Sequence, residues 1–373
     1  MAYKVFDFFA GCGGFSKGFE LAGYEIVVAN DVWEPAKETY EYNHKNTRFI
    51  LKDIEELKPS EISDIYNGTP DVIIGGPPCQ GFSLAGLRMI DDERNKLYRE
   101  FVRMVNEFQP KMFVMENVPG LVKRAKGFFL KQILEDFKEI GYQVEYKILK
   151  AADFGVPQNR QRVFFVGSRN NEFPIHFPIE THFDPNANID LFNSTLIKYV
   201  NLGDAISDLP LLDDPEYLGE EIQNYITEPR NYYQKLMRLN SDLVWNHIAT
   251  NHSPKTREII NLVPEGKNYK ALPEELRDTR KFNVAWTRLS SKEPSSTVDT
   301  GHRHHFHPWT NRIPTVRESA RIQSFDDSFI FQGTKTSQYT QVGNAVPPIL
   351  ASAIARSVES SLNREELKRE LHV

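Results

Sequence analysis

The chain has 373 residues, a formal net charge of −6, 40% hydrophobic residues and two cysteines, Cys12 and Cys79. This length predicts about two domains with an ample core, and no apolar run is long enough to span a membrane. Two cysteines in separate glycine-rich loops exclude a disulfide framework and favour a reducing cytoplasm. The chain opens on a predicted strand, so we expect no signal peptide.

Charge is distributed unevenly along the chain. Residues 179–227 hold ten acidic residues and one lysine, whereas residues 228–312 hold fourteen Lys or Arg against nine Asp or Glu. Such asymmetry predicts a surface that binds a polyanion, although a solvated charged face would have the same composition. The histidines within residues 302–307 have no cysteine nearby, so we expect no metal site there.

The first part of the chain alternates between strand and helix patterns. A strand over Tyr3–Phe9 leads into the glycine-rich loop Ala10–Ser16 and then a helix, the first unit of a nucleoside-binding α/β fold. Asp31 follows the second strand at a spacing suited to gripping ribose hydroxyls, and Asp53 follows a third, short strand, placed to meet an adenine amino group. Either carboxylate could instead cap the helix that follows it.

Cys79 stands directly after a buried strand. After Asp71, the apolar run Val72–Ile74 breaks into Gly-Gly-Pro-Pro, which continues neither a strand nor a helix, and the thiol follows at once. In open α/β sheets the carboxyl ends of strands are where ligands bind. A free cysteine is most often a small buried hydrophobe, but this setting favours a nucleophile.

Two later segments carry further polar candidates. Glu116 follows the predicted strand Lys111–Met115, where a partly desolvated carboxyl is suited to donating a proton or hydrogen bond. Arg160 and Arg162 precede the strand Val163–Gly167, and arginines two apart on an extended segment can converge on one acceptor. An isolated pair of this kind could equally form a surface salt bridge.

The regular alternation stops after residue 178. Residues 179–337 mix short segments with aromatic and basic residues and are predicted to form a second domain. Ile349–Leu362 shows helical spacing of apolar residues and needs a core to cover, so we expect it to return to the first helix or strand. The first domain is therefore predicted to comprise residues 1–178 and 338–373.

Together these motifs resemble the DNA cytosine-5 methyltransferases, most closely the bacterial restriction–modification type. The motifs occur in the family's order, as Phe9–Gly14, Asp53-Ile54, Pro77–Gln80, Glu116–Val118, Gln158–Arg162, Arg317–Arg321 and Gln341–Asn344. The resemblance implies a Rossmann-like α/β sheet with helices on both faces, dependent on S-adenosylmethionine, and a smaller, irregular target-recognition domain.

The resemblance also implies the sites. S-adenosylmethionine, which leaves as S-adenosylhomocysteine, would contact Phe9, Gly11, Cys12, Gly13, Gly14, Asp31, Val32, Asp53, Ile54, Pro78, Leu97, Asn344 and Val346. Cys79 would add to carbon 6 of a flipped-out cytosine, with Glu116 on ring nitrogen 3. Arg162, with Arg160, would orient the carbonyl oxygen and steady Glu116 or the Cys79 loop. Contacts to DNA are expected from Gln80, Ser83, Arg94, Trp286, Arg288, Arg303 and Arg312. No metal is implied.

The expected partner is double-stranded DNA carrying a short recognition sequence, with a cognate restriction endonuclease as a functional rather than a physical partner. We expect a cytoplasmic, nucleoid-associated monomer with no membrane contact. Two alternatives remain open, a tRNA cytosine-5 methyltransferase and a catalytically silent DNA-binding regulator. A nicotinamide-dependent oxidoreductase would leave Pro78-Cys79 unexplained. The long segment with a positive second half favours duplex DNA over RNA.

Overall fold

The computed structural model describes residues 2–78, 96–123, 127–186, 195–277, 286–301 and 304–371. Two units make up the chain. The first comprises Met1–Lys150, Gln161–Ile179 and Pro348–Val373, and the second comprises Ala151–Arg160 and Glu180–Pro347. Compared with the predicted division, residues 151–160 and 338–347 belong to the second unit and Ile179 belongs to the first.

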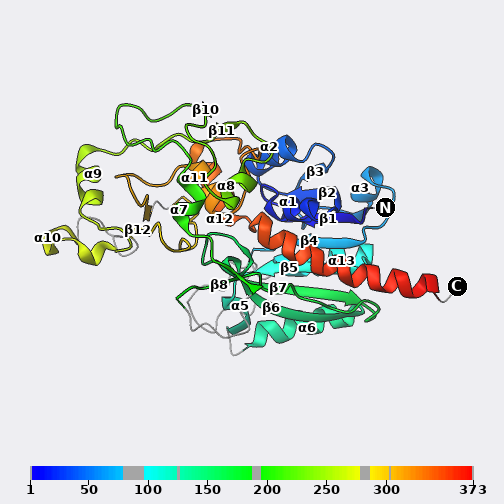
Figure 1. Cartoon of the computed structure of the whole chain (residues 1–373). Helices are drawn as coiled ribbons and strands as arrows, with labels where there is room; N and C mark the ends of the chain where they lie inside the picture. Colours follow the sequence, from blue (N-terminus) through cyan, green and yellow to red (C-terminus); the bar gives the residue numbers. More distant parts are fainter. Residues whose placement is uncertain are drawn as a thin grey trace. The chain divides into compact units, whose positions relative to one another are not determined.

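A seven-stranded sheet with the order β3-β2-β1-β4-β5-β7-β6 forms the centre of the first unit (Figure 1). The five strands from β3 to β5 are parallel, and β7 pairs antiparallel with both β5 and β6. The strands are β1 (Lys4–Phe8), β2 (Glu25–Asp31), β3 (Arg48–Leu51), β4 (Val72–Gly75), β5 (Met112–Asn117), β6 (Tyr142–Lys150) and β7 (Gln161–Arg169). This arrangement confirms the predicted α/β fold with a mostly parallel sheet.

The strand order reverses between β1 and β4, which pair with Phe8 opposite Gly75. The chain leaves β1 toward β2 on one side and leaves β4 toward β5 on the other, so the two following loops begin side by side. Such a switch point, at the carboxyl ends of parallel strands, is where ligands bind in open α/β sheets. The glycine-rich loop and the chain that leads to Cys79 both start there.

Helices cover both faces of this sheet. Because side chains alternate along a strand, Phe6, Phe8 and Phe113 point to the face covered by α3, α4, α5 and α6. Phe164 points to the opposite face, where its ring packs edge-on against Phe15 of α1 at 6.2 Å. The helices of this unit are α1 (Gly14–Leu21), α2 (Glu34–Asn43), α3 (Pro59–Ile65), α4 (Lys96–Phe108), α5 (Gly120–Lys123), α6 (Phe128–Glu139) and α13 (Pro348–Leu371).

The last helix, α13, packs against α1, as predicted for the returning chain (Figure 1). The two helices come close because Gly18 has no side chain, and a β-carbon there would lie 2.2 Å from the β-carbon of Ala351. The hydroxyl of Tyr24 also donates to the carbonyl of Ala355. Residues from the two ends of the sequence therefore complete one core.

The second unit consists of short elements joined by long connections, as predicted. Its elements are η4 (Ala151–Phe154), β8 (His182–Phe183), β9 (Ile197–Lys198), α7 (Leu202–Ile206), β10 (Ile222–Asn224), α8 (Tyr232–Met237), β11 (Leu243–Trp245), α9 (Pro254–Asn261), η6 (Tyr269–Ala271), α10 (Glu274–Arg277), β12 (Thr287–Arg288), β13 (His305–Phe306), α11 (Val316–Ile322) and α12 (Lys335–Asn344). Within the described ranges, no helix has the length and apolar character needed to cross a bilayer.

Buried ion pairs hold the centre of the second unit together. Arg321 is fully buried and pairs with Asp208 at 3.1 Å and with Asp327 at 2.6 Å. Arg312 forms a second such pair with Glu318, at 2.7 Å. Each of these cations is also bound by backbone carbonyl oxygens, which a buried charge requires to offset its lost hydration.

Candidate active site

The loop after β1 has a backbone that only certain residues adopt easily. Gly11 and Gly13 have φ angles of +54° and +94°, and Phe9 also lies in the left-handed region, at +58°. A β-carbon placed on Gly11 would meet no described atom within 4 Å, so this side of the loop is open. Gly13 precedes the first turn of α1, where backbone N–H groups have no partners within the helix.

Asp31 ties this loop to the end of β2. One carboxylate oxygen accepts from the N–H of Gly11 at 2.8 Å, and the other accepts from the N–H of Trp33 at 3.0 Å. Burial raises the pKa of this carboxyl, and the backbone donors oppose that effect. Since each oxygen has a second lone pair, the carboxylate can still accept from a ligand hydroxyl.

The residues that follow β2 and β3 differ in polarity and in exposure. Val32 is 66% exposed, and Asp53 is exposed with one oxygen accepting from the N–H of Glu55 at 3.0 Å. The side chain of Ile54 is buried in the core, so only its backbone could contact a ligand. An open glycine loop, two carboxylates and an exposed apolar side chain fit a nucleoside.

The other predicted cofactor residues differ in exposure. Pro78 is exposed and Leu97 is half-buried. Burial raises the pKa of the Cys12 thiol to about 12, so this side chain is a neutral core residue. Asn344 is exposed and Val346 is buried, and both belong to the second unit.

Asp7 is a buried acidic residue of this region that was not among the predicted site residues. It lies inside β1, is 1% exposed, and accepts a hydrogen bond from the hydroxyl of Ser16 at 2.6 Å. Its other carboxylate oxygen has no hydrogen-bond partner among the described residues. Burial raises the pKa of Asp7 to about 8. A charged residue in the middle of the apolar run Val5–Phe9 was the signal that could have identified it.

Glu116 and Asn117 lie at the carboxyl end of β5, which is longer than predicted and includes both. Glu116 forms an ion pair of 2.8 Å with Arg162, near the start of the adjacent strand β7, and both side chains are largely buried. This pairing follows from the antiparallel register of β5 and β7, in which Glu116 lies opposite Phe164. The Arg162 guanidinium and the Glu116 carboxylate are thus held within hydrogen-bonding distance by the sheet.

The same two residues contact the chain that leads to Cys79. The amide of Asn117 donates to the carbonyl of Pro77 at 3.1 Å. A β-carbon placed on Gly76 would lie 3.2 Å from the second carboxylate oxygen of Glu116. Residues forty positions apart in the sequence therefore meet two or three residues before Cys79, which itself lies outside the described residues.

Arg160 has partners of its own in the second unit. Its side chain is 1% exposed and donates to the carbonyl oxygens of Gly343, at 2.9 Å, and Asn344, at 3.4 Å. Arg162 instead pairs with Glu116 in the first unit. The contact of Arg162 with Glu116 was among those expected, whereas the contacts of Arg160 with the carbonyls of Gly343 and Asn344 were not.

Three residues predicted to contact DNA are buried. Arg288 donates to four backbone carbonyls, including Val263 and Ile260 at 2.6 Å each, and to the side chain of Asn311. Arg312 pairs with Glu318, and Trp286 is 7% exposed. Their burial argues against the predicted DNA contacts, because their donors and ring already have protein partners. Gln80, Ser83, Arg94 and Arg303 lie outside the described residues.

A model of the C-5 cytosine-specific DNA methylase family matches residues 3–360. The chain belongs to this family. Among its relatives, the type II methyltransferase M.DdeI of Desulfomicrobium norvegicum is 42% identical over 95% of this chain and 88% of its own length. M1.HphI of Haemophilus parahaemolyticus is 38% identical over 96% of this chain and 87% of its own length.

Solved structures also resemble this DNA methylase. A prophage-encoded protein of Escherichia coli, for which DNA modification methyltransferase is the suggested function, superimposes with a TM-score of 0.77 at 27% identity. That match covers 97% of this chain and all of the other. The S. pombe Dnmt2 methyltransferase has a TM-score of 0.56 at 17% identity over 96% and 99%, which shows a shared fold.

Proposed function

We propose that this family member is the modification enzyme of a type II restriction–modification system. It would methylate carbon 5 of a cytosine within a short duplex DNA sequence and so protect host DNA from a cognate endonuclease. The naming of its relatives as type II methyltransferases supports this assignment. The observation that carries the chemistry is the contact of Glu116 and Asn117 with Gly76 and Pro77, directly before Cys79.

Cytosine carbon 5 is a weak nucleophile, so the chain has to activate it. In the proposal, the Cys79 thiolate forms a bond to carbon 6, and the displaced electron pair makes ring nitrogen 3 basic. A proton shared between Glu116 and this nitrogen then moves to the nitrogen, which leaves a carboxylate. Arg162 stabilises that carboxylate through the ion pair of 2.8 Å.

When bound, S-adenosylmethionine supplies an electrophilic methyl group on a sulfonium. The open side of Gly11, the lone pairs of Asp31 and the exposed Asp53 would hold its nucleoside part. Asn344 and Val346 are retained as cofactor contacts because of the family resemblance. After carbon 5 is methylated, loss of its proton to a base, cleavage of the bond to Cys79 and return of the nitrogen-3 proton to Glu116 would restore the ring, the thiolate and the carboxyl group.

The target carbon is inaccessible inside a duplex, so the base must leave the stack. We assign sequence reading to the second unit. With Arg288 and Arg312 buried, other basic side chains of residues 228–312 must supply its phosphate contacts. A single chain carries all these parts, which favours a monomer acting on DNA in the cytoplasm.

Methyl transfer from radiolabelled S-adenosylmethionine tests the proposal. The wild type is expected to label duplex DNA as 5-methylcytosine and to leave tRNA unlabelled, while Cys79→Ser labels neither but binds the cofactor with wild-type affinity. Duplex DNA containing 5-fluorocytosine should trap the wild type as a denaturant-stable complex, because carbon 5 then has no proton to lose. Label on tRNA alone would move the substrate to RNA, and cofactor binding without transfer would favour a silent regulator.

A further inference from the structure

The carbonyl groups at the C-terminal end of helix α12 need hydrogen-bond donors from side chains. The last carbonyl groups of a helix have no partners within it, and here Pro347 and Pro348 follow, neither of which has an N–H to donate. The N–H of Ala345 satisfies only the carbonyl of Gln341. The carbonyls of residues 342–345 therefore require donors from elsewhere in the second unit.

Two buried side chains supply these donors. Arg160 binds the carbonyls of Gly343 and Asn344, and the amide of Gln323 donates to Val342 at 3.1 Å and to Ala345 at 2.6 Å. All four carbonyls thus have a partner. The arginine also places a positive charge at the negative end of the helix dipole.

Gln158 connects the two donors to the rest of the unit. Its amide donates to the side-chain oxygen of Gln323, and its own oxygen accepts from the N–H of Val298 at 2.9 Å. Both glutamines are fully buried. Arg160 lies two residues after Gln158, so one short segment fixes both the arginine and Gln323.

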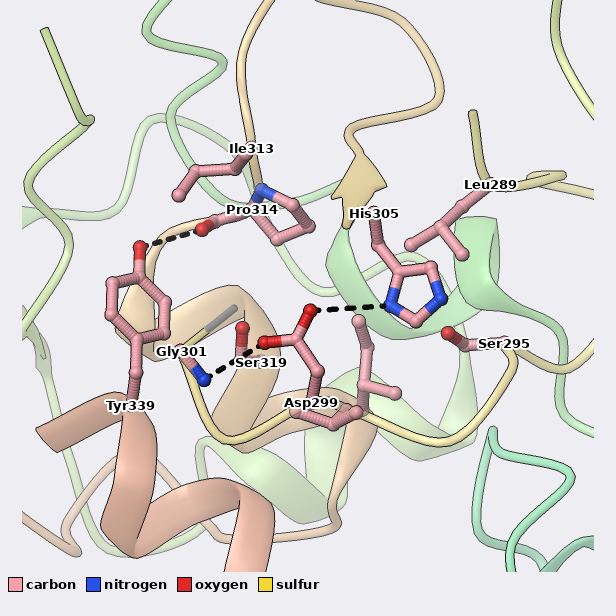
Figure 2. Close-up of a pocket in the computed structure, with 11 residues that line it drawn as sticks. Leu289, Ser295, Asp299, Gly301, His305, Ile313, Pro314, Ser319 and Tyr339 are labelled. Carbon is pink, nitrogen blue, oxygen red and sulfur yellow. Dashed lines mark hydrogen bonds and ion pairs between the residues drawn. The ribbon is translucent and has the colours of Figure 1, made fainter. Parts of the chain in front are cut away.

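On its opposite side, the same turn packs closely against the backbone of Asp299. A β-carbon on Gly343 would lie 2.5 Å from the carbonyl oxygen of Asp299. The Asp299 segment is itself fixed, because its carboxylate accepts from the N–H of Gly301 at 2.8 Å and lies beside His305 (Figure 2). Tyr339 anchors the body of α12 through a hydrogen bond from its hydroxyl to Pro314 at 2.7 Å (Figure 2).

We infer that Arg160 and Gln323 are positioning residues that hold the turn of residues 342–346, which carries the exposed Asn344, a residue for which the family resemblance implies a cofactor contact. This assignment replaces the expected catalytic role of Arg160, and it rests on the proposed function for the identity of the ligand. Arg160 acts through backbone carbonyls of the turn, whereas Arg162 acts on Glu116. The two neighbouring arginines therefore serve different steps, cofactor binding and chemistry.

The full-length chain carrying Arg160→Ala, Arg160→Lys or Gln323→Ala tests this assignment. We expect Arg160→Ala to raise the Kd and KM for S-adenosylmethionine roughly tenfold, the cost of losing charged hydrogen bonds, with kcat at saturating cofactor within about threefold of wild type. Gln323→Ala should act in the same direction, and Arg160→Lys should recover part of the affinity. Gln161→Ala, an exposed neighbour, should leave all values unchanged.

A readout without ligand separates this inference from the proposed function. Amide hydrogen exchange across residues 341–349 should be faster in Arg160→Ala and Gln323→Ala than in wild type or Gln161→Ala. Normal cofactor affinity with kcat at least a hundredfold lower in Arg160→Ala would overturn the inference and restore a catalytic role. Unchanged exchange in both variants would also overturn it. If the wild type neither binds S-adenosylmethionine nor methylates DNA, both the proposed function and the inferred ligand are wrong. The exchange data still decide in that case whether the two side chains hold the turn.

Discussion

Replacing Glu318 with glutamine should lower the unfolding free energy of the second unit, because it leaves the Arg312 cation buried without its counter-charge. The two carboxylate oxygens accept from Arg312 at 2.7 and 2.8 Å, and both side chains are at most 2% exposed. Glutamine keeps the shape and one oxygen that can still accept from the N–H of Thr315, as Glu318 does at 2.7 Å. The substitution therefore removes the charge and places an amide donor where an oxygen now accepts from Arg312.

The expected loss is about 3–5 kcal/mol of unfolding free energy, the usual cost of breaking a buried ion pair on one side. Arg312 holds the pKa of Glu318 well below its usual value of 4.5, against the opposing effect of burial. A group whose pKa is depressed by folding stabilises the protein above its unfolded pKa and loses that effect as pH falls toward the folded value. The difference between wild type and Glu318→Gln should thus be constant from pH 6 to 8 and shrink below about pH 4.5.

Urea unfolding at pH 7 and pH 4 measures both effects. Glu258→Gln, at an exposed position, serves as a matched control and should change the unfolding free energy by less than about 0.5 kcal/mol. Combining Glu318→Gln with Arg312→Met should recover part of the loss, and the double-mutant cycle gives the coupling between the two side chains. A Glu318→Gln variant within 1 kcal/mol of wild type at pH 7 would refute the reasoning, as would a pH-independent difference.

Three further predictions concern the first unit. Arg162→Ala should lower kcat about 10²–10³-fold with unchanged cofactor Kd, because the Glu116 carboxylate loses its ion pair. A change in KM alone, measured by steady-state kinetics, would contradict this prediction. For Asp7, the raised pKa means that the unfolding free energy falls as pH rises from about 4 to about 8, by at most about 1.4 kcal/mol per pH unit. Asp7→Asn cannot titrate, so its unfolding free energy relative to wild type should increase between pH 5 and pH 8. Parallel plots of unfolding free energy against pH for the two proteins would argue against the raised pKa. Gly18→Ala should cost about 1–3 kcal/mol by forcing α1 away from Ala351, seen as a lower Tm; an unchanged Tm would show that the helices can separate freely.

Local sequence patterns predicted the strands and helices of the first unit well, because each of these elements is specified by residues that are close in sequence. Apolar strands, glycine turns and the helix starts of a doubly wound sheet each depend on a few neighbouring residues, so their order could be followed from Tyr3 to Gly167. The return of the last helix to the first helix or strand was predicted for a related reason, since an apolar helical face must be covered, and it packs on α1. The resemblance to the DNA methylases rested on the same short motifs, and the family match confirms it.

Burial of charged side chains could not be predicted in this way. Arg288 and Arg312 lie in a basic stretch and were expected on a DNA-binding surface, yet their partners come from distant segments such as Val263 and Leu211. A guanidinium can be buried wherever the fold gathers enough acceptors around it, and local sequence does not show where those acceptors will be.

The sequence by itself determined the fold class, the family and the order of the chemical motifs, because each is encoded by spacing along the chain. Only the tertiary structure decided which side chains those motifs contact. Arg160 and Arg162 are two residues apart, yet one binds the end of α12 and the other binds Glu116. Their different partners follow from strand register and helix ends that are brought together from across the sequence, which no local pattern contains.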